Sequence, residues 1–379
     1  MLASTQNPIK ANVFDLLRER NIPFVLFRLP YEQEVKLLIQ FKSYPRRIND
    51  FSELPLKSGF LLAPFPVNGG EPIVLIQPDL ICAPDEAINL AGDDLKICSL
   101  FLNEPSPENT CDSTAKDSFT SQVEQAVGAI REGKMNKVVL SKMKVIEKPD
   151  DFCPEKFFNN LCNAYPHAML YYLQLPGVGS WMGATPEPLM KERDGRVYTV
   201  SLAGTQLYKE QPLDDVCWRA KEIAEQAIVS RFIVRLLDKM GVEEMQVTGP
   251  NNFLAGNLVH LSTGFSFHTD NLRVSMGRFI SALHPTPSVA GLPKEDSLQF
   301  ISKLEQHNRS YFSGLLGPLQ LGGETHLYVN LRCMQLFDRE LVLYSGAGIT
   351  ENSDPEKEWL ETDNKMMTLL NILHVQTGH

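Results

Sequence analysis

Apolar and polar residues alternate over several long segments, and this period of two predicts a protein rich in β-strands. In KVVLSKMKVIE (137–147), Lys137 shares one strand face with Ser141 and Met143, and Lys142 lies on the opposite face. Strands are predicted at 24–30, 59–65, 72–82, 137–147, 167–175, 197–202, 258–267, 325–337 and 340–346.

Apolar residues recur at helical spacing in fewer segments. Helices are predicted at 118–133, 214–240, 294–316 and 354–374. Long strands separated by a few long helices indicate a mixed α/β protein of the α+β type with large sheets, and do not fit the regular rhythm of a doubly wound fold. The polar, apolar-poor segment 103–118 divides an uninformative part, 1–117, from a motif-rich part, 118–374.

Composition narrows the class of protein. The chain has 379 residues and a net charge of −10, with no basic stripe, so a nucleic-acid partner is not expected. The seven cysteines show no paired spacing, which favours a reducing compartment. The sequence shows neither the apolar core of a signal peptide nor an apolar stretch of about 20 residues, which predicts a cytoplasmic protein without a membrane partner.

Lys137 is the first candidate for chemistry. It leads an apolar strand face, and burial would lower the pKa of its amine and make it a usable general base. On the pattern alone, a lysine at a strand end that extends to water is the favoured interpretation. Glu187 lies in GATPEPL, where glycine and proline would hold its carboxylate rigidly, but spacing alone assigns it no role.

Two strands and a glycine-rich segment could form a binding surface. In 325–337, the residues His326, Tyr328, Asn330 and Arg332 alternate on one face, which is either solvated or lines a polar cavity where the arginine binds a carboxylate. A second strand, 258–267, has the same arrangement around His260. The glycines of SGAG (345–348) allow a ligand to approach the backbone, or they form a plain turn.

Glutamates on two helices are candidates for a metal site. Glu358, Glu361 and Lys365 share one helical face, where an exposed ion pair or a hard cation would explain them. Glu225 extends an apolar stripe and needs a cation or a metal as its partner.

Taken together, nine segments resemble the chorismate-utilising enzymes, and among them the isochorismate synthases, in the order in which that family carries them. The resemblance covers about residues 120 to 370. The segments are KVVLSK (137–142), GATPEPL (183–189), SLAGT (201–205), KEIAEQ (221–226), NLVHLS (257–262), LHPTPSVAG (283–291), YVNLRC (328–333), SGAG (345–348) and EWLETDNK (358–365).

The resemblance implies one domain over 1–379, in which two large, mainly antiparallel sheets pack together with helices outside. It implies an isomerase that converts chorismate to isochorismate with Mg²⁺, for menaquinone or siderophore biosynthesis. Lys137 would be the general base and Glu187 the general acid. Glu225, Glu358 and Glu361 would form the metal site. The substrate would contact Ala203, Gly204, Thr205, His260, Tyr328, Arg332, Gly346 and Lys365.

Related activities differ at single positions. Enzymes of this family that use ammonia usually carry glutamine where Lys137 stands, so no glutamine amidotransferase subunit is expected, and a monomer is predicted. A salicylate synthase shares Lys137 but usually lacks the HPTP at 284–287. A catalytically inactive chorismate-binding subunit is the remaining alternative. Gln226 and Lys142 depart from the family pattern, where histidine and arginine are frequent, and Gln226 leaves the surroundings of the metal open.

Overall fold

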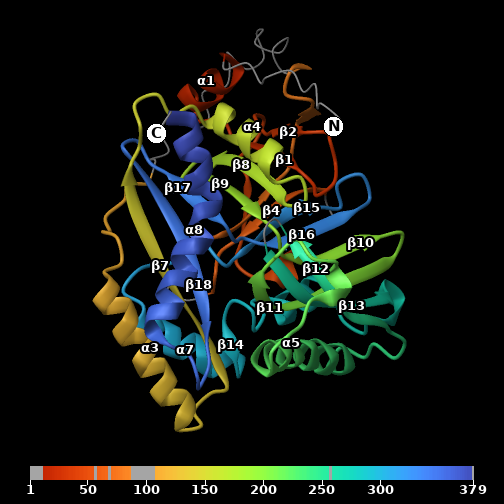
Figure 1. Ribbon diagram of the computed structural model, residues 1–379. Coiled ribbons are helices and arrows are strands. Elements are labelled where there is room, and N and C mark those ends of the chain that lie inside the picture. The colour runs from red at the N-terminus through yellow and green to blue at the C-terminus, as the bar shows by residue number, and fades with distance from the viewer. Residues whose placement is uncertain (1–11, 55–57, 67–69, 87–106, 256–257, 378–379) are drawn as a thin grey trace.

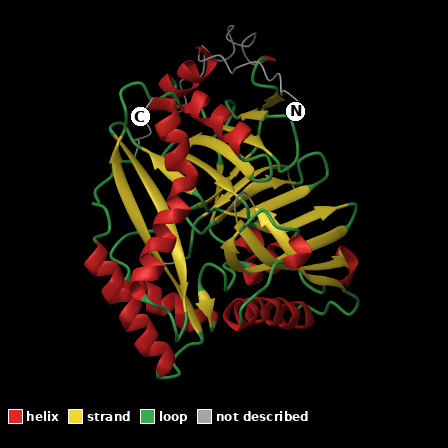
Figure 2. Cartoon of the chain, in the orientation of Figure 1, coloured by secondary structure: helices red, strands yellow, loops and turns green. Residues whose placement is uncertain are grey.

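Two large sheets form the body of the molecule, as Figures 1 and 2 show. The computed structural model describes residues 12–54, 58–66, 70–86, 107–255 and 258–377. Every pairing between the strands described is antiparallel. Sheet A runs in the order β14 (Gly291–Leu292), β7 (Lys137–Glu147), β18 (Glu340–Ile349), β17 (Cys333–Leu336), β9 (Gly179–Thr185), β8 (Met169–Leu175), β1 (Phe24–Arg28), β2 (Lys36–Ile39), β6 (Leu80–Cys82). Sheet B runs in the order β12 (Gln246–Ala255), β13 (Leu258–His268), β11 (Arg196–Leu207), β10 (Pro188–Arg193), β16 (Thr325–Val329), β15 (Leu315–Leu319), β4 (Gly59–Ala63), β5 (Ile73–Ile76), β3 (Arg46–Ile48).

Helices cover the outer faces of the two sheets. In Figure 1, α8 runs along sheet A and contacts β18, whereas α5 lies under β11 and β13 of sheet B. The α-helices described are α1 (Asn12–Glu19), α3 (Lys116–Arg131), α4 (Pro154–Ala164), α5 (Ala220–Lys239), α6 (Met276–Leu283), α7 (Lys294–Leu304) and α8 (Pro355–Thr377). The short 3-10 helices are η1 (Phe51–Glu53), η3 (Leu213–Asp215) and η4 (Thr269–Asn271).

Apolar side chains fill three clusters. One lies between the sheets and is rich in aromatic residues, with Trp181 stacked on Tyr344 at 5.5 Å between ring centroids. A second lies between sheet A and helices α1, α4 and α8, and a third lies under α3, α5, α6 and α7. Each sheet therefore buries apolar residues on both of its faces, one against the other sheet and one against helices.

The predicted class of fold is confirmed, and several predicted elements are too. Strand 137–147 occurs as β7 with the same bounds, and its two faces separate as expected. Lys142 turns to α8, where its amine lies 2.6 Å from Asp363 and over the ring of Trp359. Strands from the first third of the chain occur in both sheets, so this part completes each sheet.

Three predicted elements extend across a change of element that the structure shows. The run 72–82 is two strands, β5 in sheet B and β6 in sheet A. The run 325–337 is also divided between the sheets, as β16 and β17. The helix predicted over 294–316 ends at Leu304, and β15 starts at Leu315. The local period of apolar residues does not indicate where a chain crosses from one layer to another.

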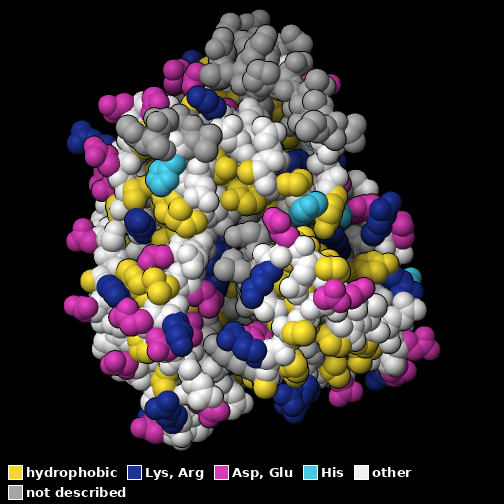
Figure 3. Space-filling model, in the orientation of Figure 1, with side chains coloured by type: hydrophobic (Ala, Val, Ile, Leu, Met, Phe, Trp, Pro, Cys, Tyr) yellow, Lys and Arg dark blue, Asp and Glu magenta, His cyan; other side chains and the backbone are white. Residues whose placement is uncertain are grey.

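Charge on the visible face and the length of the helices bear on possible partners of this protein. None of the helices in the described ranges is long and apolar enough to cross a membrane. On the face drawn in Figure 3, lysine and arginine are interspersed with aspartate and glutamate.

Candidate active site

A cavity of about 210 Å³ is lined by both sheets together with α5 and α8. It lies beside the C-terminal part of β18. Strand β17 pairs only with Leu341–Leu343 of β18, so the rest of that edge is not paired with β17. The lining includes Arg219, with an 81% exposed side chain, and Glu361, at 48%, which mark the connection to solvent. The predicted site residues that line the cavity are Lys137, Glu187, Gly204, Glu225, His260, Arg332, Gly346, Glu361 and Lys365.

Two predicted site residues lie outside this lining. Tyr328 is 1% exposed and belongs to the aromatic cluster between the sheets, so the expected contact with substrate is not supported. Glu358 is buried on α8 and does not line the cavity, so its expected place near the metal, through water, stays a prediction. Ala203 and Thr205 lie on β11, and their side chains are outside the described part of the structure.

The crossing from β16 to β17 explains why Tyr328 and Arg332 separate. A continuous strand would place both side chains on one face, but Arg332 has a left-handed backbone with φ +49°. Asn330 fixes the crossing rather than lining the cavity: it is fully buried, and its side chain accepts a hydrogen bond from Tyr171 and donates one to the Tyr311 carbonyl. Arg332 is thereby turned into the cavity.

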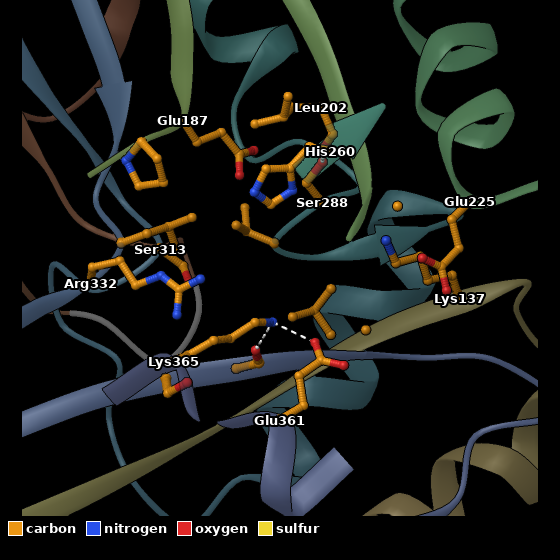
Figure 4. Close-up of a pocket in the computed structure, with 18 of the residues that line it drawn as sticks. Lys137, Glu187, Leu202, Glu225, His260, Ser288, Ser313, Arg332, Glu361 and Lys365 are labelled. Atoms are coloured by element: carbon orange, nitrogen blue, oxygen red, sulfur yellow. Dashed lines mark hydrogen bonds and ion pairs between the residues drawn. The ribbon is translucent and has the colours of Figure 1, made fainter. Parts of the chain in front are cut away.

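Lys137 is fixed where β7 begins. Its carbonyl accepts a hydrogen bond from Ser297, and its residue pairs with Leu292 of β14. The side chain is buried, and burial lowers the pKa of its amine below the ordinary value of 10.5. Glu225 is the carboxylate that opposes this most strongly, and the two side chains lie at the same end of the cavity in Figure 4. The result is a lysine that loses its proton more readily than a lysine in water.

Glu187 occupies another side of the cavity (Figure 4). It follows Thr185 at the end of β9, and the Thr185 hydroxyl binds the Val329 carbonyl at 2.5 Å. The Val329 amide in turn donates to the Glu187 carbonyl at 3.0 Å, so the backbone is held on both sides. Burial raises the pKa of this carboxyl to about 7, against the opposing charges of Lys137, Lys365 and Arg332. Glu187 is therefore about half protonated near neutral pH and mostly protonated below it.

Cationic groups face the same space. The Nη1 atom of Arg332 is buried and has no hydrogen-bond partner within the part of the chain described. Lys365 donates to the Gly346 carbonyl at 2.8 Å and pairs with Glu361 at 2.7 Å. In a strand, the N–H of a residue points to the same side as its carbonyl, so the Gly346 amide also faces away from β7. These donors could bind a carboxylate.

His260 lies between these groups as a neutral side chain. It projects from β13 and is 8% exposed. Burial, followed by the charges of Arg332 and Lys365, lowers the pKa of its imidazole to about 4. A neutral imidazole can donate a hydrogen bond to an anionic ligand without adding charge.

Several lining residues have no role in the sequence predictions. Glu222 is buried and forms an ion pair with Arg219 at the start of α5. Its spacing of three from Glu225 was the signal that could have identified it, because such residues share a helical face. Ser288 and Val289 line the cavity after the HPTP motif, while His284 of that motif is buried elsewhere, 6.4 Å from the Phe51 ring.

Gln226 does not take part in this site. Its side chain amide donates to Ser230 at 2.9 Å and to the Thr263 hydroxyl, on the side of α5 that faces β13. Gln226, at a position where histidine is frequent in the family, therefore packs between α5 and sheet B and does not line the cavity.

A buried ion pair connects two walls of the cavity. Arg309 binds both oxygens of Glu305, at 2.8 and 2.6 Å. The same guanidinium donates to the carbonyls of Val139 on β7 and Val289 on the loop, at 2.7 and 2.9 Å. Glu305 also accepts the Ser141 amide at 2.7 Å. These bonds satisfy the buried charges and hold the start of β7 against the loop.

The fold and the cavity together define a class of enzyme. Two packed antiparallel sheets enclose a space that fits a small anionic molecule, with a lysine and a glutamate whose pKa values are shifted towards each other. Such a pair is suited to acid–base chemistry, because each pKa is shifted towards the neutral range in which general acids and bases work best.

The chain belongs to the chorismate-binding enzyme family, whose model matches residues 94–374. It is similar to isochorismate synthase DhbC of Bacillus subtilis, with 26% identity over 271 residues and 68% of each chain covered. Its fold is similar to that of the menaquinone-specific isochorismate synthase MenF from Escherichia coli, with a TM-score of 0.75 at 21% identity over 97% of this chain and 92% of that one. A putative 2,3-dihydroxybenzoate-specific isochorismate synthase, DhbC from Bacillus anthracis, gives 0.74 at 22% identity over 95% and 99%. The family resemblance found in the nine segments is confirmed.

Proposed function

We propose that this protein is an isochorismate synthase, an isomerase that converts chorismate to isochorismate. The observation that carries the proposal is the presence of Lys137 and Glu187 in one cavity of a chorismate-binding enzyme, with pKa values shifted towards each other. Similarity to isochorismate synthases over 68% of the chain supports this activity among those of the family.

Chorismate carries two carboxylates, and the cavity offers donors for both. Arg332, Lys365 and the Gly346 amide would bind them, and His260 would approach the carboxylate on the ring. Lys137 would take a proton from water as its oxygen adds at C2, and the ring double bonds would shift. Glu187 would give its proton to the C4 hydroxyl, which leaves as water. One water enters and one leaves, so the product is an isomer of the substrate.

A magnesium ion fits the carboxylates that line the cavity. Glu225 and Glu361 come from two different helices, and carboxylate oxygens suit this cation. The residues described contain no cluster of three or more potential ligands, so water or a substrate carboxylate would complete the coordination. When bound, Mg²⁺ would withdraw electron density from the ring carboxylate. The proposed nucleophile is water, so an amidotransferase subunit is not required, and we expect a monomer.

The product identifies the reaction. Incubation of the protein with chorismate and Mg²⁺ should give a mixture of chorismate and isochorismate by chromatography, with little pyruvate in the first minutes. Pyruvate and salicylate in equal amounts would instead identify a salicylate synthase. Saturable chorismate binding without turnover would identify an inactive binding subunit. Addition of ammonium should yield no anthranilate.

A further inference from the structure

The side chain of Lys137 runs across Gly348 on the neighbouring strand. A Cβ atom at position 348 would lie 2.9 Å from Cε of Lys137 and 3.4 Å from its Nζ. The first distance is shorter than a normal carbon–carbon contact, so a side chain at this position and the observed lysine conformation exclude each other. Among the described residues, and apart from the chain neighbours of Gly348, no other atom lies within 4 Å of that Cβ position.

Strand pairing explains this contact. Gly348 of β18 is directly opposite Val139 of β7, and opposed residues of an antiparallel pair project from the same face. Lys137 lies two residues before Val139 and therefore projects from that face as well. Residue 348 and Lys137 are diagonal neighbours, so any side chain at 348 would extend into the path that the lysine takes.

Backbone conformation does not require glycine at this position. Gly348 is not among the glycines with positive φ, so alanine fits its backbone. Gly346, in the same motif, differs: a Cβ there would lie 3.1 Å from the Leu140 carbonyl oxygen and would not meet Lys137. The two glycines of SGAG therefore serve separate purposes. Gly346 exposes its backbone to the cavity, and Gly348 leaves room for the Lys137 side chain.

We propose that Gly348 is a positioning residue for Lys137. The missing Cβ opens the path along which the lysine crosses the face of β18 and places its amine in the cavity. Substitution at 348 would leave the strands paired and displace the amine, because the end of a lysine side chain moves more easily than a packed backbone. This inference rests on the proposed function, since it concerns the group that would activate water.

The test is Gly348→Ala, compared with Gly264→Ala on β13. Gly264 is a strand glycine outside the cavity lining, and the nearest atom to its added Cβ, the Thr248 carbonyl oxygen, is 3.9 Å away. Gly348→Ala should lower kcat by about 100-fold, the effect of displacing a reacting group by roughly 1 Å, and change KM by less than about threefold. Gly264→Ala should keep both constants. Wild-type kcat in Gly348→Ala would overturn the proposal.

A double-mutant cycle separates this contact from a general effect on folding. In a Lys137→Ala chain the conflicting atoms are absent, so adding Gly348→Ala should not lower the melting temperature, whereas it should lower it in the wild-type chain. Equal losses in both backgrounds would show that Gly348 acts independently of Lys137 and would refute the proposal. This readout needs no turnover, so it stands even if the product experiment disproves the isochorismate synthase activity.

Discussion

The proposed chemistry depends on two residues whose pKa values are shifted from their usual ranges in opposite directions. Burial lowers the pKa of the Lys137 amine and raises that of the Glu187 carboxyl to about 7. A lysine in water has a pKa near 10.4, and only about one in two thousand is neutral at pH 7. Without the cavity, the base and the acid would each be in the wrong form.

The pH profile tests this pair. Activity should rise with pH as Lys137 loses its proton, and fall above about pH 7 as Glu187 loses the proton it must donate, which gives a bell. Lys137→Ala should reduce turnover by ~10²–10⁴-fold while chorismate affinity stays within a few-fold. Lys137→Arg should be equally inactive, since guanidinium remains protonated.

Initial rates between pH 5 and 9, with chorismate affinity measured by calorimetry, provide the comparison. Glu187→Gln should remove the fall at high pH together with most of the activity. Near-wild-type turnover in either Lys137 variant would show that another group activates the water, and the mechanism would be wrong although the fold is right.

Among the elements, β18 and α8 make the site possible. Beyond Tyr344, β18 has lost its neighbour β17, and its edge faces the cavity instead of another strand. Helix α8 packs against β18, and its Glu361 and Lys365 side chains lie beside that edge. The Lys365 amine donates a hydrogen bond to the Gly346 carbonyl there. An unpaired strand edge thus becomes a binding surface rather than a site of aggregation.

Metal dependence is expected at this junction. Glu361→Gln should raise the Mg²⁺ concentration required for half-maximal activity by about tenfold or more, because one of two carboxylates is lost. Glu356→Gln is the matched control: this glutamate lies on the same helix, is 63% exposed and pairs with Lys116 at the surface. EDTA should abolish turnover, and Mg²⁺ should restore it. Full activity of thoroughly demetallated protein would contradict the magnesium proposal.

At the scale of the whole molecule, burial of neutral histidines connects folding to pH. His284 is enclosed by the fold, and burial, helped by the Lys294 charge, lowers the pKa of its imidazole to about 3. The unfolded chain, with a pKa near 6.5, binds a proton that the folded chain excludes. The free energy of unfolding should therefore decrease as the pH falls below 6.5, by up to ~1.4 kcal/mol per pH unit for each such histidine.

Urea unfolding at pH 6.5 and 5.0 measures this effect. His260 contributes in the same direction, since its pKa is lowered to about 4, whereas Glu187 contributes in the opposite direction because its pKa is raised. His284→Gln should make the loss of unfolding free energy between the two pH values smaller. The difference should be the contribution of the single proton that His284 binds in the unfolded chain. An unchanged loss in this variant would show that His284 is protonated in the folded protein.

The sequence alone determined the local features of this protein. The alternation in 137–147 gave the bounds and both faces of β7, including the separation of Lys137 from Lys142. Helical spacing located α3 and α8 to within three residues and α5 to within six, and the order of nine segments identified the family. These features depend on neighbours in sequence, whose contacts repeat with the period of a strand or helix.

Tertiary structure alone decided which of these residues meet. The division of 325–337 sent Tyr328 into the core and Arg332 into the cavity, through a left-handed arginine that no local signal marks. The shifted pKa values of Lys137 and Glu187 likewise depend on burial by distant segments. Desolvation and close contact depend on how distant segments pack together. The pattern along a strand indicates only which face of the strand a residue occupies.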